Sequence, residues 1–240
     1  MEHTGKICHV AKVHYIVNRN LINPQEDIMP ILNDKVIDEV KKALQNIKNE
    51  VRLVLFTQAF ECAHCQETHQ LLEELCSANP LLNLEVHQFE SDKEAVEKYD
   101  VDKIPAIAVM GEKDYGIRFY GIPAGYEFSS LLSAILMVST GITKLNNDTR
   151  SFLDNLAKPV HMQVFVTPTC PYCPKAVILA HQMAFYSDKV KADMVEISEF
   201  PHLAQKYNVQ GVPRTLINEK WFQEGAAPEH MIVAKIKESL

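Results

Sequence analysis

Two Cys-x-x-Cys motifs in matching surroundings constrain the fold of this chain more than any other feature of its sequence. The first cysteines of the two motifs are 108 residues apart, and each is followed, 43 residues later, by a proline that has an apolar residue before it. The two sets are Cys62, Cys65, Ile104 and Pro105, and Cys170, Cys173, Val212 and Pro213. Both prolines also end the pattern Lys-Tyr-x-Val-x-x-apolar-Pro. This agreement in one register indicates an internal duplication.

Length and composition fit a globular protein of one large domain or two of about 110 residues, and the duplication favours two. The net charge of −7 provides no broad basic surface for nucleic acid or an anionic membrane. The first 17 residues are interrupted by lysines and histidines, and no apolar stretch reaches the roughly 18 residues of a membrane span. We therefore expect a cytoplasmic protein without nucleic-acid or membrane partners.

Hydrophobic periodicity predicts a similar order of helices and strands in each half. In the first half, apolar residues at helical spacing over 32–47 precede a buried strand at 51–56. The elements expected next are a helix at 62–78, a strand at 84–89, a helix at 93–99, strands at 106–110 and 117–120, and a helix over 128–136. The second half should contain a helix from about 143, strands at 160–166, 214–218 and 221–222, and a helix from 228.

This alternation predicts an α/β fold, with a central mixed β-sheet flanked by helices in each half. Gly141 lies near the expected boundary, which gives domains at 25–141 and 142–240. Residues 1–24 form an N-terminal extension that stays unassigned.

The paired cysteines point to redox chemistry. Six cysteines are too few for a disulfide-built scaffold, and in a reducing compartment paired cysteines usually indicate catalysis or metal binding. A Cys-x-x-Cys at a strand-to-helix junction places its first sulfur near free helical N–H groups, which stabilise a thiolate. We therefore expect Cys62 and Cys170 to attack disulfides, and Cys65 and Cys173 to resolve the mixed disulfides.

The residues between the cysteines should tune the two centres differently. His64 can stabilise the thiolate and make the first disulfide a stronger oxidant, whereas Pro171 suits the first turn of a helix. Tyr172 and Arg214 are candidate substrate contacts, and the alternative for each is an exposed residue near the site. Unequal potentials could pass electrons in one direction, which is a hypothesis. At Ile104-Pro105 and Val212-Pro213, a cis peptide bond would make a fixed turn that presents backbone groups to an extended substrate.

These motifs resemble those of a known family. Cys-Pro-Tyr-Cys-Pro at 170–174 resembles the glutaredoxin motif, and Val212-Pro213 resembles the cis-proline of thioredoxin-fold proteins. The tandem arrangement, together with the segment 116–128, resembles the prokaryotic protein disulfide oxidoreductases, also called glutaredoxin-like proteins, over about 25–240.

The resemblance implies two tandem thioredoxin-like folds that oxidise, reduce and sometimes isomerise protein disulfides in cell redox homeostasis. It implies protein dithiols and disulfides as substrates and a thioredoxin reductase-type flavoenzyme as the electron source. The redox groups would be the two disulfides, with no separate cofactor and no metal.

The chain departs from related motifs at two points. The buried acid of thioredoxin, six residues before the nucleophile, is replaced by Phe56 and Val164, so proton transfer to the resolving cysteine needs another group or water. Gly211 stands where glutaredoxins usually have a threonine before Val-Pro, which counts against a glutathione site.

Two other functions stay open. One is an electron carrier for a peroxiredoxin, resembling the paired thioredoxin-like N-terminal domain of alkyl hydroperoxide reductase flavoproteins, although that domain normally keeps one cysteine pair. The other is a noncatalytic module that binds client peptides. A zinc site is disfavoured because zinc-binding cysteine pairs are usually 15–20 residues apart, and an iron–sulfur cluster at Cys170 is disfavoured by Pro171. Cys76 is expected in the core, and Cys8 is not placed.

Overall fold

The computed structural model describes residues 29–240, so the extension at 1–24 and its Cys8 lie outside the described residues. The first half contains α1 (Asp34–Ala43), η1 (Leu44–Asn46), β1 (Val51–Thr57), α2 (Cys65–Ser77), β2 (Leu82–Gln88), α3 (Lys93–Lys98), β3 (Ala106–Met110), β4 (Asp114–Tyr120), η2 (Gly125–Glu127) and α4 (Phe128–Thr140). The second half contains α5 (Asn147–Asp154), β5 (Val160–Val166), α6 (Cys173–Tyr186), β6 (Val190–Glu196), α7 (Pro201–Lys206), β7 (Arg214–Ile217), β8 (Trp221–Glu224) and α8 (Glu229–Ser239).

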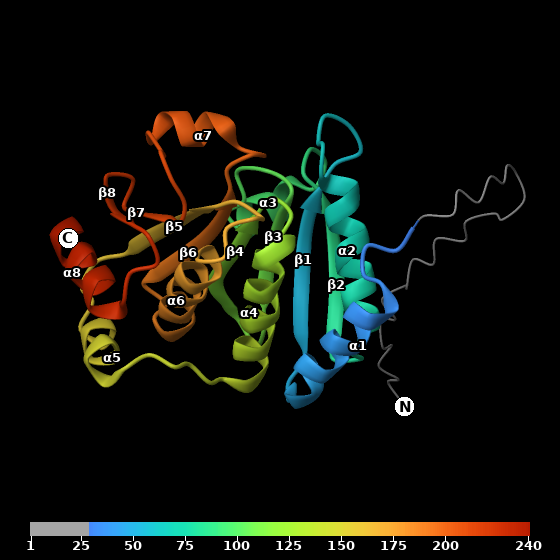
Figure 1. Cartoon of the computed structure of the whole chain (residues 1–240), viewed down its shortest axis with the longest axis horizontal. Coiled ribbons are helices and arrows are strands. Elements are labelled where there is room, and N and C mark those ends of the chain that lie inside the picture. Colours follow the sequence, from blue (N-terminus) through green and yellow to red (C-terminus); the bar gives the residue numbers. More distant parts are fainter. Residues whose placement is uncertain (1–28) are drawn as a thin grey trace, which may run out of the picture.

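The eight strands within residues 29–240 form one continuous sheet, in the order β2-β1-β3-β4-β6-β5-β7-β8 (Figure 1). In each half, the first strand pairs in parallel with the second and antiparallel with the third, which pairs antiparallel with the fourth. The prediction of an α/β fold with a mixed sheet in each half is confirmed. The sequence did not predict that the two sheets join, through parallel pairing of β4 with β6.

The two faces of the sheet are covered unequally. A single large core packs α1, α2, α4, α5, α6 and α8 against one face and runs through both halves. A smaller core lies on the other face beneath α3 and α7. No helix within residues 29–240 is long and apolar enough to cross a membrane.

Local sequence explains why several elements begin and end where they do. The side chains of Asn33 and Asn146 accept hydrogen bonds from N–H groups in the first turns of α1 and α5. Helix α4 ends at Gly141, which has φ 73° and so adopts a left-handed conformation that favours glycine. This residue coincides with the boundary that we propose between the domains 25–141 and 142–240.

The strand register reveals one difference between the two halves. Leu53 of β1 is paired with Val109 of β3, and Met162 of β5 is paired with Ile217 of β7. The cysteines, the prolines and the strands β3 and β7 repeat after 108 residues, whereas β1 and β5 repeat after 109. The loop before Cys62 is therefore one residue longer than the loop before Cys170.

The extra residue changes one assignment made from the sequence. The residue six positions before Cys62 is Phe56, but the strand register makes Leu55 the counterpart of Val164. The prediction that Phe56 occupies the position of thioredoxin's buried acid is therefore wrong. Leu55 and Val164 lie in the large core, and Phe56 faces the opposite side of the sheet. Counting back from the cysteine could not detect the insertion. Both counterparts of thioredoxin's buried acid remain apolar.

The topology brings both cysteine motifs to one edge of the sheet. β1, β4, β6 and β5 all run in the same direction, and each motif follows the carboxyl end of β1 or β5. The two strands are four strand spacings apart, which is about 19 Å.

Candidate functional site

The first cysteine pair forms a disulfide at the start of α2. Cys62 and Cys65 are bonded with a Cα–Cα separation of 5.5 Å, and Cys65 is buried while Cys62 is half-buried. The more exposed sulfur is the one expected to attack disulfides. The helix begins at Cys65, so the prediction that it starts near Cys62 is wrong, because residues 58–64 form the loop that follows β1.

The second pair, Cys170 and Cys173, also forms a disulfide, with the same Cα–Cα separation of 5.5 Å. The N–H of Cys173 points at the sulfur of Cys170, 3.1 Å away. An N–H donor in this position would stabilise a thiolate at Cys170 after reduction, as the nucleophile assignment requires. Helix α6 begins at Cys173, so Pro174 and not Pro171 occupies its first turn; Pro171 and Tyr172 lie in the preceding turn.

Each proline loop lies beside the strand that leads to a cysteine pair. The register pairs Phe56 with Ala106 and Phe165 with Arg214, so Pro105 and Pro213 flank the carboxyl ends of β1 and β5. Both Ile104-Pro105 and Val212-Pro213 are cis. Pro105 and Pro213 are buried, whereas Ile104 and Val212 are half-buried. The structure therefore brings all four predicted loop residues to the same edge as the cysteines.

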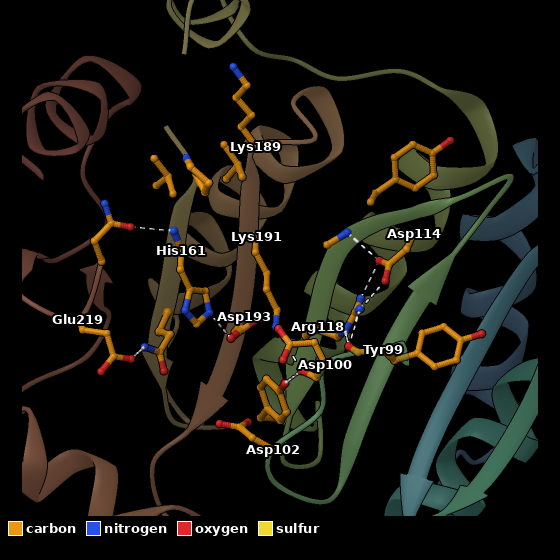
Figure 2. Close-up of a pocket in the computed structure, with 18 of the residues that line it drawn as sticks. Tyr99, Asp100, Asp102, Asp114, Arg118, His161, Lys189, Lys191, Asp193 and Glu219 are labelled. Carbon is orange, nitrogen blue, oxygen red and sulfur yellow. Dashed lines mark hydrogen bonds and ion pairs between the residues drawn. The ribbon is translucent and has the colours of Figure 1, made fainter. Parts of the chain in front are cut away.

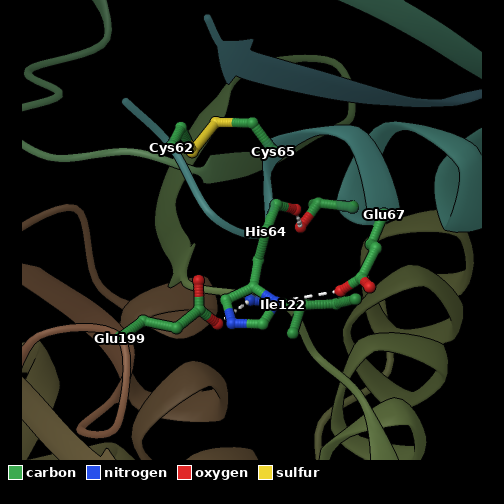
Figure 3. Close-up of a disulfide and its surroundings, with 7 residues drawn as sticks. Cys62, His64, Cys65, Glu67, Ile122 and Glu199 are labelled. Carbon is green, nitrogen blue, oxygen red and sulfur yellow. Dashed lines mark hydrogen bonds and ion pairs between the residues drawn. A yellow bond between two sulfur atoms is a disulfide. The ribbon is translucent and has the colours of Figure 1, made fainter. Parts of the chain in front are cut away.

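His64 lies between carboxylates from both halves of the molecule. Its Nδ1 is 2.8 Å from Oε2 of Glu67, and Figure 3 shows Glu67 and Glu199 on opposite sides of the imidazole. The hydrogen bond to Glu67 raises the pKa of His64, burial opposes the rise, and the negative charges of Glu199 and Glu196 add to it. The imidazole, which Figure 3 shows directed away from the disulfide and toward Glu199, is thereby biased toward its cationic form.

Residues 121–127, which we call the bridge segment, connect the surroundings of the two disulfides. Three of its N–H groups donate hydrogen bonds outside the segment: Gly121 to the carbonyl of Pro105 (2.9 Å), Ile122 to Oε1 of Glu199 (2.7 Å) and Tyr126 to the carbonyl of Pro168 (3.0 Å). Pro168 lies two residues before Cys170. The bridge segment thus links the first proline loop to the loop that carries the second motif.

Glu127 ends the bridge segment as a buried carboxyl group. It is 1% exposed, its Oε2 accepts a hydrogen bond from Ser130 (2.6 Å), and its Oε1 has no partner within residues 29–240. Burial raises the pKa of Glu127 to about 7, against the effect of the Ser130 hydrogen bond. The turn η2, which includes Glu127, contacts α6, the helix that begins at Cys173. Sequence reasoning missed this group because it lies more than 40 residues from either motif.

Aromatic side chains are exposed around both disulfides. Phe60 is 84% exposed just before Cys62, Tyr172 is 70% exposed within the second motif, and Tyr126 is 52% exposed on the bridge segment. Exposed aromatic side chains are enriched where proteins bind their partners.

Two other residues considered from the sequence lie apart from this chemistry. The guanidinium of Arg214 is buried, 3.0 Å from a carboxylate oxygen of Glu224 and stacked over the ring of Phe222. Cys76 is a free, half-buried thiol whose pKa is raised to about 11 by burial, so it is largely uncharged near neutral pH.

A large cavity of about 880 Å³ lies elsewhere, on the sparsely covered face of the sheet (Figure 2). None of the four paired cysteines lines it, and its charged groups largely pair with one another. These pairs include Lys191 with Asp100, Arg118 with Asp114, and His161 with Asp193. The first of them joins the two halves. The cavity is therefore a polar seam between the halves and not part of the disulfide sites.

The fold and the two disulfides define a class: tandem thioredoxin-fold proteins with two redox-active Cys-x-x-Cys centres. A family model described as a thioredoxin domain matches residues 160–238. A protein disulfide oxidoreductase from Aeropyrum pernix has a structure similar to this one, with a TM-score of 0.81 and 30% identity, covering 87% of this chain and 93% of that chain. The chain belongs to this family of thioredoxin-fold disulfide oxidoreductases, which confirms the resemblance found in the sequence.

Similarity extends to proteins with other descriptions. The N-terminal domain of an alkyl hydroperoxide reductase from Enterococcus faecalis matches with a TM-score of 0.79 and 25% identity, covering 85% of this chain and 99% of that chain. Among curated proteins, an NADH dehydrogenase of Bacillus subtilis is 26% identical and an alkyl hydroperoxide reductase of Staphylococcus aureus is 27% identical, each over 208 residues and 86% of this chain. The chain spans about 38% of the length of these curated relatives.

Proposed function

We propose that this protein catalyses dithiol–disulfide exchange on other proteins at two centres, with Cys62 and Cys170 as nucleophiles and Cys65 and Cys173 as resolving residues. The observation that carries this proposal is the placement of two complete disulfide centres, each beside its own proline loop, at one edge of a single sheet. A substrate at this edge would meet a half-buried Cys62 at the first centre, whereas Cys170 at the second is only 8% exposed.

The surroundings of the disulfides favour a polypeptide substrate over a small thiol. The exposed rings of Phe60, Tyr126 and Tyr172 form a rim that a protein client could cover. Ile104 and Val212 lie beside this rim, and their half-buried positions leave them available to an extended chain. Protein dithiols are therefore the proposed reductants, with a flavoenzyme that presents a dithiol as the proposed source of electrons.

Proton transfer at the second centre is assigned to Glu127. When the mixed disulfide at Cys170 is resolved, Cys173 must lose a proton as it attacks. A carboxyl group with a pKa of about 7 can take up and release a proton near neutral pH, and Glu127 lies on a turn that contacts the helix of Cys173. The acid that is absent from β5 would then be supplied by the first half of the molecule.

The test is dithiothreitol-driven reduction of insulin by the wild type, by Cys62→Ser and Cys170→Ser singly, and by the double variant. We expect partial activity in each single variant and none in the double variant. Cys76→Ser is the matched control and should retain full activity, because this thiol lies outside both disulfides. An inactive wild type, with both pairs reduced and accessible, would refute protein disulfide exchange.

A second candidate is an electron carrier dedicated to a peroxiredoxin. The match to an alkyl hydroperoxide reductase over 86% of this chain favours it. The presence of two disulfides favours the broader activity. A wild type that reduces a disulfide-form peroxiredoxin rapidly, but leaves insulin oxidised, would support the carrier instead.

A further inference from the structure

We propose that Glu199, from the second half of the molecule, is a positioning residue for the first redox centre, where it holds His64, the residue before Cys65, in its protonated form. This inference rests on the proposed function and names a determinant of its first site. The second half would then control the charge at a disulfide that it does not contain.

The position of Glu199 is fixed by the bridge segment. Its Oε1 accepts a hydrogen bond of 2.7 Å from the N–H of Ile122, and its own N–H donates to Oε2 of Glu196 at 2.8 Å. Gly121 has φ 88°, and a Cβ placed there would lie 2.6 Å from Oε1 of Glu199. The glutamate side chain therefore fits closely against the bridge segment, with its carboxylate beside the imidazole of His64 (Figure 3).

Three carboxylates act on His64. Glu67 comes from α2, and Glu196 and Glu199 come from the end of β6 and the loop after it. The side chain of Glu67 is 60% exposed, so water screens its charge, whereas Glu199 is half-buried and Glu196 is buried. The carboxylate of Glu196 accepts hydrogen bonds from the N–H groups of Ser198 and Glu199.

This arrangement has a direct consequence for the chemistry. A cationic imidazole within the first motif adds positive charge that favours the thiolate formed on reduction, and a carboxylate beside the imidazole keeps the cation populated to higher pH. The pKa of His64 is raised first by the hydrogen bond to Glu67 and then by the negative charges of Glu199 and Glu196, against the effect of burial. Burial also raises the pKa of Glu199, so the effect of Glu199 requires a pH at which its carboxyl group is ionised. The second motif, Cys-Pro-Tyr-Cys, has no histidine, so the influence runs from the second half to the first.

The test compares E199Q with the wild type in two measurements. The amide oxygen of glutamine can still accept the hydrogen bond from Ile122, so the variant removes the charge and keeps the contact. Titration of the His64 imidazole is followed by NMR in the oxidised protein, with the resonance assigned by its loss in His64→Gln. The potential of the first centre is measured against pH in a background that carries Cys170→Ser and Cys173→Ser.

In E199Q we expect the midpoint of the His64 titration to move to lower pH. The plot of the first centre's potential against pH should change slope at a correspondingly lower pH. Glu199→Asp keeps the negative charge, so its His64 titration midpoint should lie close to that of the wild type. E67Q should also move the midpoint to lower pH. An unchanged titration of His64 in E199Q, in a protein that folds as the wild type does, would overturn the proposal. The NMR titration needs no turnover, so its outcome is separate from failure of the insulin assay.

Discussion

Substituting glutamine for Glu127 turns a buried ionisable group into a neutral one of nearly the same shape. The folded-state pKa of Glu127 is about 7, against 4.5 for the free side chain. As pH rises from about 4.5 to 7, the unfolded chain loses this proton while the folded protein keeps it. The unfolded state then binds fewer protons, so this group lowers the free energy of unfolding across that interval.

The magnitude follows from the two pKa values. At about 1.4 kcal/mol for each pKa unit, the gap between them corresponds to about 3 kcal/mol of lost stability above pH 7 relative to pH 4. Glu127→Gln lacks this loss. The free energy of unfolding of the variant, relative to that of the wild type, should therefore rise by about 3 kcal/mol between pH 4 and pH 8.

The assay is urea unfolding of the oxidised proteins at closely spaced pH values, with the difference between variant and wild type as the measured quantity. His181 makes this difference necessary, because it has the opposite pH dependence over almost the same interval and would hide the effect in the wild-type curve. The Cys76→Ser variant provides a pH-independent control. A difference between Glu127→Gln and wild type that stays constant from pH 4 to pH 8 would refute the assignment of an elevated pKa to Glu127.

Two further predictions concern stability. His181 is buried, and burial lowers its pKa to about 4, so the free energy of unfolding should fall by about 3 kcal/mol as pH drops from 6.5 through 4. His181→Gln should remove this fall from acid unfolding curves. A fall of the same size in the variant would contradict the prediction. Gly125→Ala should cost clearly more than the roughly 1–2 kcal/mol of a left-handed alanine, because its Cβ would collide with the carbonyl of Pro168. Gly141→Ala, with a similar φ but open space around it, is the matched control, and equal losses of stability in the two would show that the bridge contact contributes little.

The sequence predicted the duplicated pattern and much of the secondary structure because both rest on local information. The strands at 106–110 and 160–166 were predicted with the bounds found in the structure, since apolar runs ended by turn residues mark buried strands. Joining of the two sheets depends on which edge strands meet, and local pattern does not encode that. β6 is almost wholly buried where its counterpart β2 is partly exposed, a difference that arises from the pairing of β6 with β4.

The cysteines and prolines of the candidate site could be found from their spacing, but the acids could not. Glu199 corresponds in the repeat to Ser91, so the duplication gave no signal for it. Glu199 lies near His64, and the turn of Glu127 contacts α6, only because the bridge segment packs against the second half. The one signal available was the pair of acids in Glu196-Ile-Ser-Glu199 at the end of a strand, and without the tertiary contacts that pattern indicates nothing more than a polar loop.

The spacing of the two centres constrains any transfer of electrons between them. Thiol–disulfide exchange requires direct contact of sulfur atoms, whereas the strands that lead to the two motifs are about 19 Å apart. A relay from one centre to the other therefore cannot proceed by direct exchange in this arrangement, even if their potentials differ. It requires a third dithiol or disulfide, on a client or a partner protein, that contacts each centre in turn. Such a partner would move along the edge that carries Phe60, Tyr126 and Tyr172. The bridge segment carries Glu127, the proposed proton-transfer group of the second centre, and holds Glu199 near His64 of the first, while the electrons travel with the partner.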